Sequence, residues 1–380
     1  MPLLKYIKNN LLSVVIALVF FLEGYSKALY FNTGINSILP KTIKSLLICY
    51  MILKLISHKK VLKEFYYVLL LTVFFIIGQL STEEGIVYSN IVLFSKYVFA
   101  IVCYMYFKCI PVKNKVRVFY VFEGVILVNS VLIFIGYFFD VIHFKTYLGA
   151  RFGYNGLFYS SSLSSYVYLI ALFYFLIVEK AHFFYNRKVV FVIFSSCLIG
   201  TKTIYLSLVF ICLLYFTKYA KFKYKNIFAA ALVAISIFLG YLVFFKWGIF
   251  NEIRRSEGFF SSLLSFRNDL FLDETLPYVK NNWTFINYCF GGVNDFTTRS
   301  EMGFIDVLYF FGFVGGALYI ILYCKTFITF KINTVNMLFL CFLGCVVFVT
   351  GNYFIYTTTP LFLLVLREKI TDLSISKLRE

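Results

Sequence analysis

The sequence predicts an all-α polytopic membrane protein, and three features of its 380 residues support this fold class. Hydrophobic residues make up 61% of the chain, charged residues only 14%, and the mean hydropathy is +0.85. A soluble domain is about 45–50% apolar and about 25% charged, so polar groups could not cover the surface of this chain after folding. The apolar residues also form long runs, as a bilayer core requires.

Twelve apolar runs separated by polar breaks predict about twelve transmembrane helices. A bilayer core about 30 Å thick takes roughly 20 helical residues, or somewhat fewer where neighbouring helices help. The first run is expected to stay in the protein, because no small-residue cleavage pattern follows it. The runs are residues 11–31, 42–56, 65–80, 91–107, 118–139, 163–178, 189–200, 203–217, 226–245, 303–324, 332–350 and 352–366.

The seventh and eighth runs are shorter than the others. They predict either one re-entrant hairpin or two crossings joined at Thr201 and Lys202. The sequence has no internal repeat and no low-complexity linker, so residues 1–380 are expected to form a single integral membrane domain.

The distribution of charge predicts the orientation. The chain carries 36 Lys and Arg against 18 Asp and Glu, a net charge of +18. If both termini are cytoplasmic, the cytoplasmic segments carry most of the excess Lys and Arg, while the opposite segments are balanced. This asymmetry is the positive-inside pattern of membrane proteins, so it predicts cytoplasmic termini and requires no nucleic-acid partner.

Cysteine and histidine give no sign of a metal centre. The nine Cys form no CxxC motif, and the three His are dispersed. Eight cysteines lie inside or beside the apolar runs and are interpreted as small packing residues, and only Cys289 lies in a long polar segment. We therefore expect no metal and no cofactor.

A long outer insertion, residues 246–302, is the leading candidate for the functional site. Loops of this length usually fold over the structure they interrupt and carry function. A solvated loop whose charges only keep it in water is the alternative. Its charged residues include Arg254, Arg255, Arg267, Asp269 and Arg299.

Arg151 lies between Gly149 and Gly153 in a second outer segment. A guanidinium presents five donors in a planar fork that suits a phosphate, and neighbouring glycines let a backbone approach a ligand. An anchor to lipid headgroups is the alternative. Lys202 at the hairpin tip is either a snorkelling lysine or a third cation that converges with Arg151 and Arg267 on one anion.

Two carboxylates mark the start of the run 303–324. Glu301 is either a helix cap favoured by the helix dipole or a functional group. Asp306 lies inside an apolar helix, where an ionisable group is costly and normally faces a cavity or a partner. Gly312 and Gly316 form a small-xxx-small pair, which predicts close packing between helices.

Four charged residues fall inside other apolar runs. Glu23 and Lys27 are spaced i, i+4 and can pair on one helix face. Lys96 and Glu123 are placed near the same side on consecutive helices. These residues are either structural pairs and snorkelling ends or parts of a proton or ion relay.

The order of these features over roughly residues 140–325 resembles a known family. An arginine-bearing outer segment, a short hairpin, a large outer loop and a helix headed by a carboxylate follow one another. This order is similar to that of bacterial Wzy-type O-antigen and capsular polysaccharide polymerases, in the superfamily that includes the O-antigen ligases. The matching segments are GLFYSSSLSSY (156–166), LIGTKTIYLSL (198–208), SFRNDLF (265–271), FGG (290–292) and SEMGFIDVLYFFGFVGG (300–316).

The resemblance implies a GT-C-like glycosyltransferase of the bacterial plasma (inner) membrane. Members join oligosaccharide repeat units carried on undecaprenyl diphosphate, en bloc and at the periplasmic side, in lipopolysaccharide or capsule biosynthesis. The implied partners are these lipid-linked oligosaccharides, the lipid bilayer, a chain-length regulator and a flippase. Essential arginines of the family correspond in position to Arg151 and Arg267, and Lys202 stands where many relatives have Arg.

This chemistry needs fixed cations. Breaking an anomeric C–O bond leaves a diphosphate whose negative charge grows, and cations at that position stabilise the transition state more than the ground state. Arginine stays protonated, so no metal is required. The attacking sugar hydroxyl needs either a carboxylate base or tight orientation, and the candidates are Glu301, Asp306 and Asp269. The predicted catalytic residues are Arg151, Arg267, Glu301 and Asp306, and the predicted diphosphate- or sugar-binding residues are Lys202, Arg254, Arg255, Asp269 and Arg299.

Two other functions are weighed against the polymerase. Ligases of the same superfamily usually show a His-Asn pair where this chain has Glu301, and residues 246–302 contain no His, which favours a polymerase. A flippase for lipid-linked sugars would use the intramembrane charges and the cationic outer site. The long outer loop and the lack of two related halves argue against a flippase.

Overall fold

The chain folds almost entirely into helices in the computed structural model, which describes residues 9–376 except 36, 58–61, 148, 150 and 247. Helices account for 79% of the structure, and no β-strand occurs among the described residues. The termini lie partly, and residues 58–61 entirely, outside the described residues; the sequence assigns these segments to the cytoplasm.

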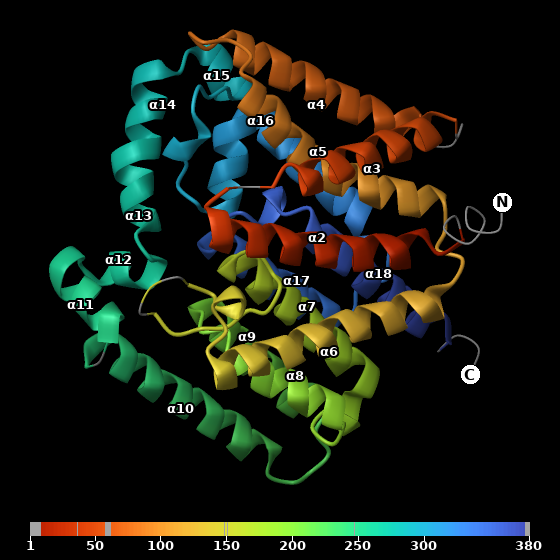
Figure 1. Cartoon of the computed structure of the whole chain (residues 1–380), viewed down its shortest axis with the longest axis vertical. Coiled ribbons are helices and arrows are strands. Elements are labelled where there is room, and N and C mark those ends of the chain that lie inside the picture. Colours follow the sequence, from red (N-terminus) through yellow and green to blue (C-terminus); the bar gives the residue numbers. More distant parts are fainter. Residues whose placement is uncertain are drawn as a thin grey trace.

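Each predicted apolar run lies largely within a helix of its own (Figure 1). The helices that contain the runs are α2 (Leu11–Thr33), α3 (Leu39–Ile56), α4 (Leu62–Leu80), α5 (Tyr88–Cys109), α6 (Lys115–Phe139), α7 (Ser161–Glu179), α8 (Arg187–Cys197), α9 (Lys202–Lys218), α10 (Lys225–Phe245), α16 (Gly303–Phe327), α17 (Thr334–Val349) and α18 (Thr358–Ser376).

Six helices of the described chain are long and apolar enough to cross a membrane. The fold class of a helical membrane protein is therefore confirmed at this level. Helix α8 has 11 residues, about 16 Å, which is roughly half of a bilayer core. The six helices are α2, α5, α6, α7, α10 and α16.

Polar residues just before the apolar runs fix where several helices begin. The Asn114 side chain accepts from the backbone N–H of Arg117 at the start of α6, and Ser160 accepts from Leu163 at the start of α7. Thr201 accepts from the N–H of Ile204 and so begins α9 immediately after the hairpin tip. These N-caps satisfy backbone donors that have no partner within the helix.

Helix α7 is the centre of the bundle. All its residues from Leu163 to Ile177 are buried. It packs against α9 and α18, and residues 361–366 of α18 are fully buried as well. Helix α10 is the opposite case, because none of its described residues is buried although it is strongly apolar. An apolar helix that packs along one side and leaves the rest of its surface exposed suits a lipid environment.

The insertion folds into short helices that cover one side of the bundle, the left in Figure 1. Helix α2 begins and α18 ends on the opposite side. The rings of Tyr278 and Trp283 pack on Tyr309 of α16 and so attach the insertion to the bundle. Its segments are α11 (Gly248–Glu257), α12 (Phe259–Leu264), α13 (Arg267–Asp269), the π-helical turn η4 (Leu270–Thr275), α14 (Leu276–Asn282), α15 (Phe285–Phe290) and the 3-10 turn η5 (Phe296–Thr298).

Two details differ from the sequence predictions. The last run was predicted as a helix from residue 352, but Asn352 has a left-handed φ of 69° and a 3-10 turn follows, so α18 begins only at Thr358. The close helix packing predicted for Gly312 and Gly316 forms at Gly312, where a Cβ would overlap backbone atoms of residues 289–291 at the end of α15, and differs from the prediction at Gly316. Gly312 has a φ of 69° and interrupts α16, and a Cβ on Gly316 would meet Leu308 of the same helix.

Candidate functional site

Three of the predicted residues, Arg151, Lys202 and Arg267, form one group that we call the three-cation cluster. The Lys202 Nζ lies 4.3 Å from the centre of the Phe250 ring, and the Arg151 guanidinium carbon lies 5.4 Å from the same centre. The Arg151 carbon is also 4.1 Å from the centre of the Tyr147 ring. Both arginines act electrostatically on Lys202. Stacking on aromatic faces holds cations without neutralising them.

Glycines bring the Arg151 segment and the hairpin tip together. A Cβ on Gly153 would overlap the carbonyl oxygen of Ile199, and a Cβ on Gly200 would overlap that of Phe152. The Tyr154 N–H donates to the Leu198 carbonyl at 2.7 Å across the same contact. The sequence predicted that Gly153 lets a ligand approach the backbone. In the structure, the backbone of the hairpin occupies the space that a side chain at Gly153 would need.

The end of α12 holds the other two cations. The Lys202 ammonium donates to the carbonyls of Ser262 and Leu263 at 2.7 and 2.9 Å. The Arg267 Nη1 donates to the carbonyl of Leu264 at 3.1 Å. Carbonyls at a helix C-terminus lack partners within the helix and carry partial negative charge, so they attract cations. A carbonyl has no formal charge, so the bound cation keeps its full positive charge.

The turn that presents Arg267 is strained. Ser265 and Phe266 both have positive φ, 55° and 65°, which is costly for residues with a side chain. Three buried polar atoms follow without a hydrogen-bond partner among the described residues: Nε of Arg267, Oδ1 of Asn268 and Oδ2 of Asp269. Buried polar atoms are nearly always satisfied, so these three atoms can take a water molecule or a ligand as their partner.

The cluster has no counter-charge within the described residues. No carboxylate forms an ion pair with Arg151, Lys202 or Arg267. Lys202 precedes the apolar part of α9. Burial lowers the pKa of its ammonium from 10.5 to about 7, and the charges of Arg151 and Arg267 lower this pKa in the same direction. An anion entering the cluster would reverse the effect of the arginines.

Glu301 stands on a strained backbone position at the head of α16. Its φ is 56°, and a Cβ on Gly351 would overlap its carbonyl oxygen. The Glu301 side chain is 38% exposed, and its Oε1 lies 3.6 Å from Nη2 of Arg299. Arg299 also donates to Asn352 at 3.1 Å. Arg299 therefore positions the Glu301 loop and lies outside the three-cation cluster.

Asp306 is buried, with 3% of its surface exposed. Its Oδ1 accepts from the hydroxyl of Ser300 at 3.0 Å, and the same hydroxyl accepts from the N–H of Met302 at 3.2 Å. Asp306 thus supports the turn that carries Glu301. Of the two predicted catalytic carboxylates, only Glu301 is exposed enough to meet a substrate.

Residues 350–352 connect the two parts of the site. The hydroxyl of Thr203, next to Lys202, lies 3.0 Å from that of Thr350, while Gly351 packs on the Glu301 backbone. The hydroxyl of buried Tyr166 donates to the Thr350 carbonyl. The cluster and Glu301 are therefore attached to opposite ends of one short segment.

The remaining predicted residues of the insertion do not join the cluster directly. Arg254 donates to the carbonyl of Phe244 at 3.0 Å and to Asn251 at 3.2 Å, so it fastens α11 to the end of α10. Arg255 is exposed on α11. Asp269 accepts from Ser261 at 3.0 Å, and its other oxygen has no hydrogen-bond partner within the described part of the chain.

The predicted pairing of Glu23 with Lys27 does not form. Glu23 accepts from Lys44 of α3 at 2.9 Å and from the Thr358 hydroxyl at 2.8 Å. Lys27 instead donates to Asn155 and, at 2.7 Å, to the Gly156 carbonyl. Both side chains therefore bind residues from distant segments of the chain and not each other, as the helical spacing had suggested.

Lys96 and Glu123 do not form a pair either. The hydroxyl of Tyr174 donates to Glu123 at 3.0 Å, and Lys188 lies 3.7 Å from it. Lys96 instead interacts electrostatically with Lys41, Lys44, Arg299 and Glu23.

Sequence reasoning missed the groups that hold the cations. Tyr147 and Phe250 are two of many aromatic residues, and nothing in their spacing distinguishes them. The carbonyls of α12 have no sequence signal at all. The one sequence feature that could have identified Phe250 as a cation-binding residue is its place in the charged insertion, a few residues before Arg254 and Arg255.

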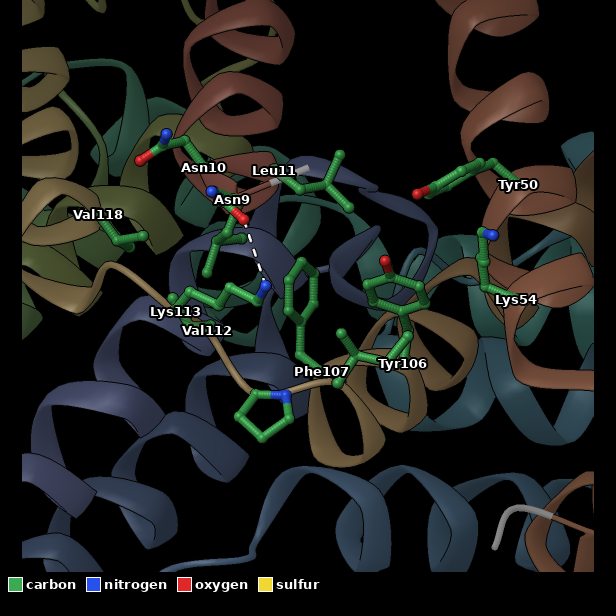
Figure 2. A pocket seen from close by; sticks show the side chains of 13 residues that line it. Asn9, Asn10, Leu11, Tyr50, Lys54, Tyr106, Phe107, Val112, Lys113 and Val118 are labelled. Carbon is green, nitrogen blue, oxygen red and sulfur yellow. Dashed lines mark hydrogen bonds between the residues drawn. The ribbon is translucent and has the colours of Figure 1, made fainter. Parts of the chain in front are cut away.

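A cavity of about 270 Å³ lies elsewhere, at the end of the bundle where α2 begins (Figure 2). Tyr50 and Lys54 of α3 and Tyr106 of α5 line it, and Lys113 donates to Asn9 at 3.3 Å. None of the predicted site residues lines this cavity, so it is separate from the three-cation cluster.

Comparison of the chain with protein-family models, curated proteins and solved structures gives no match. The functional assignment therefore depends on two features of the site. The three-cation cluster has no carboxylate partner among the described residues, and the partly exposed Glu301, on a strained backbone, contacts the same segment, residues 350–352.

Proposed function

We propose that this protein is a Wzy-type polysaccharide polymerase, a metal-independent glycosyltransferase that joins undecaprenyl-diphosphate-linked oligosaccharides of O-antigen or capsule. The observation that carries the proposal is the three-cation cluster. Arg151, Lys202 and Arg267 come from three separate segments and have no carboxylate partner among the described residues. Fixed cations without counter-charge favour a multiply anionic ligand, and a diphosphate fits this requirement.

The diphosphate is the leaving group of the proposed reaction. The bond between the anomeric carbon and the diphosphate oxygen breaks, and its electron pair stays on that oxygen. The three cations stabilise this growing charge more strongly in the transition state than in the bound substrate. Arg151 and Arg267 remain protonated throughout, because guanidinium groups do not titrate in proteins.

The acceptor in this scheme is a sugar hydroxyl of a second lipid-linked unit. Its oxygen forms the new bond to the anomeric carbon, and Glu301 accepts its proton as general base. The 38% exposure of Glu301 supports this role, whereas the burial of Asp306 supports a positioning role through Ser300.

The proposed location is the bacterial inner membrane, with the site on the periplasmic side. In this arrangement all twelve apolar helices contribute to the membrane domain, both termini are cytoplasmic and the insertion is periplasmic. The positive-inside pattern supports the orientation. Helix α10 adjoins α11 and α12 and offers an apolar surface for a polyprenyl chain beside Lys202, whose Nζ lies 5.8 Å from the Phe244 ring centre.

Glutamine substitutions at Arg151 and Arg267 test the proposal. Each removes one fixed charge from the leaving-group site, and we expect polymerisation to slow at least about a hundredfold. Long polysaccharide chains should disappear while single lipid-linked units persist, as measured on gels of lipid-linked glycans from a complemented deletion strain. Lys280→Gln is the matched control, because it removes an exposed charge from the same insertion and should leave chain lengths unchanged.

Three outcomes would count against this function. Wild-type chain lengths in both arginine variants contradict the role of the cluster. Full-length polymer on undecaprenyl diphosphate in the deletion strain identifies a ligase. Purified protein that fails to lengthen glycans in detergent, yet moves lipid-linked sugars between the leaflets of a vesicle, identifies a flippase.

A further inference from the structure

We propose that a second cavity, which we call the lysine cavity, binds the phosphate group of an anionic ligand. The cavity has a volume of about 350 Å³ and lies between α2, α3, α5 and the segment before α18. Lys41, Lys44 and Lys96 supply its positive charge. No residue of the three-cation cluster lines it, so the inference does not depend on the proposed polymerase activity.

Positive charge exceeds negative charge in the lysine cavity. Glu23 is the only carboxylate among the described lining residues. It already accepts from Lys44 at 2.9 Å and from the Thr358 hydroxyl at 2.8 Å. Neither Lys41 nor Lys96 has a hydrogen bond or ion pair to another described residue. Lys41 is exposed and Lys96 is partly buried, so an anion in the cavity would offset the repulsion that Lys41 and Lys44 exert on Lys96.

Lys96 is the most informative member of the set. It lies within α5, a helix long and apolar enough to cross a membrane, where a charged group is costly. Lys41, Lys44 and Arg299 all act on it electrostatically, and Glu23 alone opposes them. A lysine that only anchors a helix end reaches toward the polar surface. Lys96 instead lines a cavity together with other lysines, as expected for an anion site.

Hydroxyl groups complete the donors that a phosphate needs. Ser26 and Ser45 also line the lysine cavity, whereas the Tyr356 hydroxyl, which lines it too, already bonds to Ser160 and Ser162. Lysine binds phosphate as a point charge, and hydroxyls contribute directed hydrogen bonds to its oxygens. The same donors suit the phosphate of a membrane-lipid headgroup and that of a soluble compound, so the test must separate these two sources.

The test uses the full chain in lipid nanodiscs, in an Arg151→Gln/Arg267→Gln background that weakens the other anion site. The first assay titrates inorganic diphosphate into the protein in phosphatidylcholine nanodiscs. The second assay uses nanodiscs that also contain phosphatidylglycerol, and native mass spectrometry measures how much phosphatidylglycerol stays bound to the protein. Lys96→Gln should weaken whichever ligand binds by about tenfold, the effect of losing one charge-assisted contact. Lys96→Arg should restore binding. Lys54→Gln, on the same helix as Lys41 but in the other cavity, should have no effect.

Each outcome decides the question. Lys96-dependent binding of diphosphate supports a soluble phosphate ligand, and Lys96-dependent retention of phosphatidylglycerol supports a lipid headgroup. Binding that is equal in the parent and Lys96→Gln, or absent with both probes, overturns the proposal. Equal thermal unfolding midpoints of the parent and Lys96→Gln would show that a loss of binding comes from the missing lysine and not from a destabilised fold. Failure of this test leaves the polymerase proposal intact, because that proposal concerns Arg151 and Arg267.

Discussion

Main-chain carbonyls and aromatic rings, rather than carboxylates, hold the cations of the three-cation cluster. Lys202 and Arg267 donate to consecutive carbonyls at the end of α12, and Arg151 and Lys202 share the Phe250 ring. Carboxylate partners would hold these side chains equally well, but they would cancel the charge that an anion needs. The residues that position the cations therefore leave their charge available.

The lowered pKa of Lys202 predicts that anion binding depends on pH. Burial and the two arginines bring this pKa to about 7, so the free ammonium loses its proton as the pH rises above 7. A diphosphate binds the protonated form, and affinity should fall by up to about tenfold per pH unit between pH 7.5 and 9. Titration calorimetry with inorganic diphosphate at several pH values measures this slope.

The matched variant for this measurement is Lys202→Arg. An arginine keeps its proton over the whole range, so the pH dependence that remains in this variant comes from the titration of diphosphate itself. A wild-type pH dependence equal to that of Lys202→Arg would show that Lys202 does not contact the anion.

At the scale of elements, a contact between backbones joins α4, α15 and α16. A Cβ on Gly78, Gly291 or Gly312 would overlap backbone atoms of another of these segments. Gly312 also has a φ of 69°, which interrupts α16 where the end of α15 passes. This contact ties the insertion to the bundle, so it fixes the loop that leads to Glu301.

Alanine at Gly312 should destabilise the protein. The substitution adds strain at a positive φ and forces apart the backbone of residues 289–291, at a cost of about 2–4 kcal/mol. The thermal unfolding midpoint in detergent should fall by several degrees. Gly124→Ala in α6 is the control, because its Cβ would meet no atom within 4 Å. An unchanged midpoint for Gly312→Ala would mean that the break in α16 relaxes at little cost.

The two ends of the whole molecule differ in their chemistry. One end carries the start of α2, the end of α18 and the loop with Lys113, which belongs to the basic segments (Figure 1). The other carries the insertion, with near-neutral mixed charge and the three-cation cluster. The proposed orientation would place the basic end in the cytoplasm and the insertion in the periplasm.

Cysteine labelling tests this orientation. In a Cys289→Ser background, Lys280→Cys in the insertion should react with a membrane-impermeant maleimide on intact spheroplasts. Lys113→Cys should react only after the membrane is opened, because its segment is predicted to be cytoplasmic. The reverse pattern, or equal labelling of both, would place the insertion or the basic loops differently from the proposal.

The sequence by itself determined the helical membrane fold and the residues worth considering. Long apolar runs must become helices in lipid, because every backbone polar group has to find its partner within the segment. The unusual residues were also visible in advance, since a charge such as Asp306 in an apolar run or an arginine among glycines is locally conspicuous. Helix ends were less certain: Asn352 delays α18 through its backbone conformation, which no apolar pattern shows.

Only the tertiary structure decided which charges meet. The helical spacing paired Glu23 with Lys27, but Lys27 bonds to Asn155 and Glu23 to Lys44. Likewise, Phe250 and the carbonyls of α12 acquire their role only because the insertion folds back onto the hairpin tip. These contacts join segments far apart in the chain, and their strength depends on distance and burial in three dimensions, quantities that residue order alone does not contain.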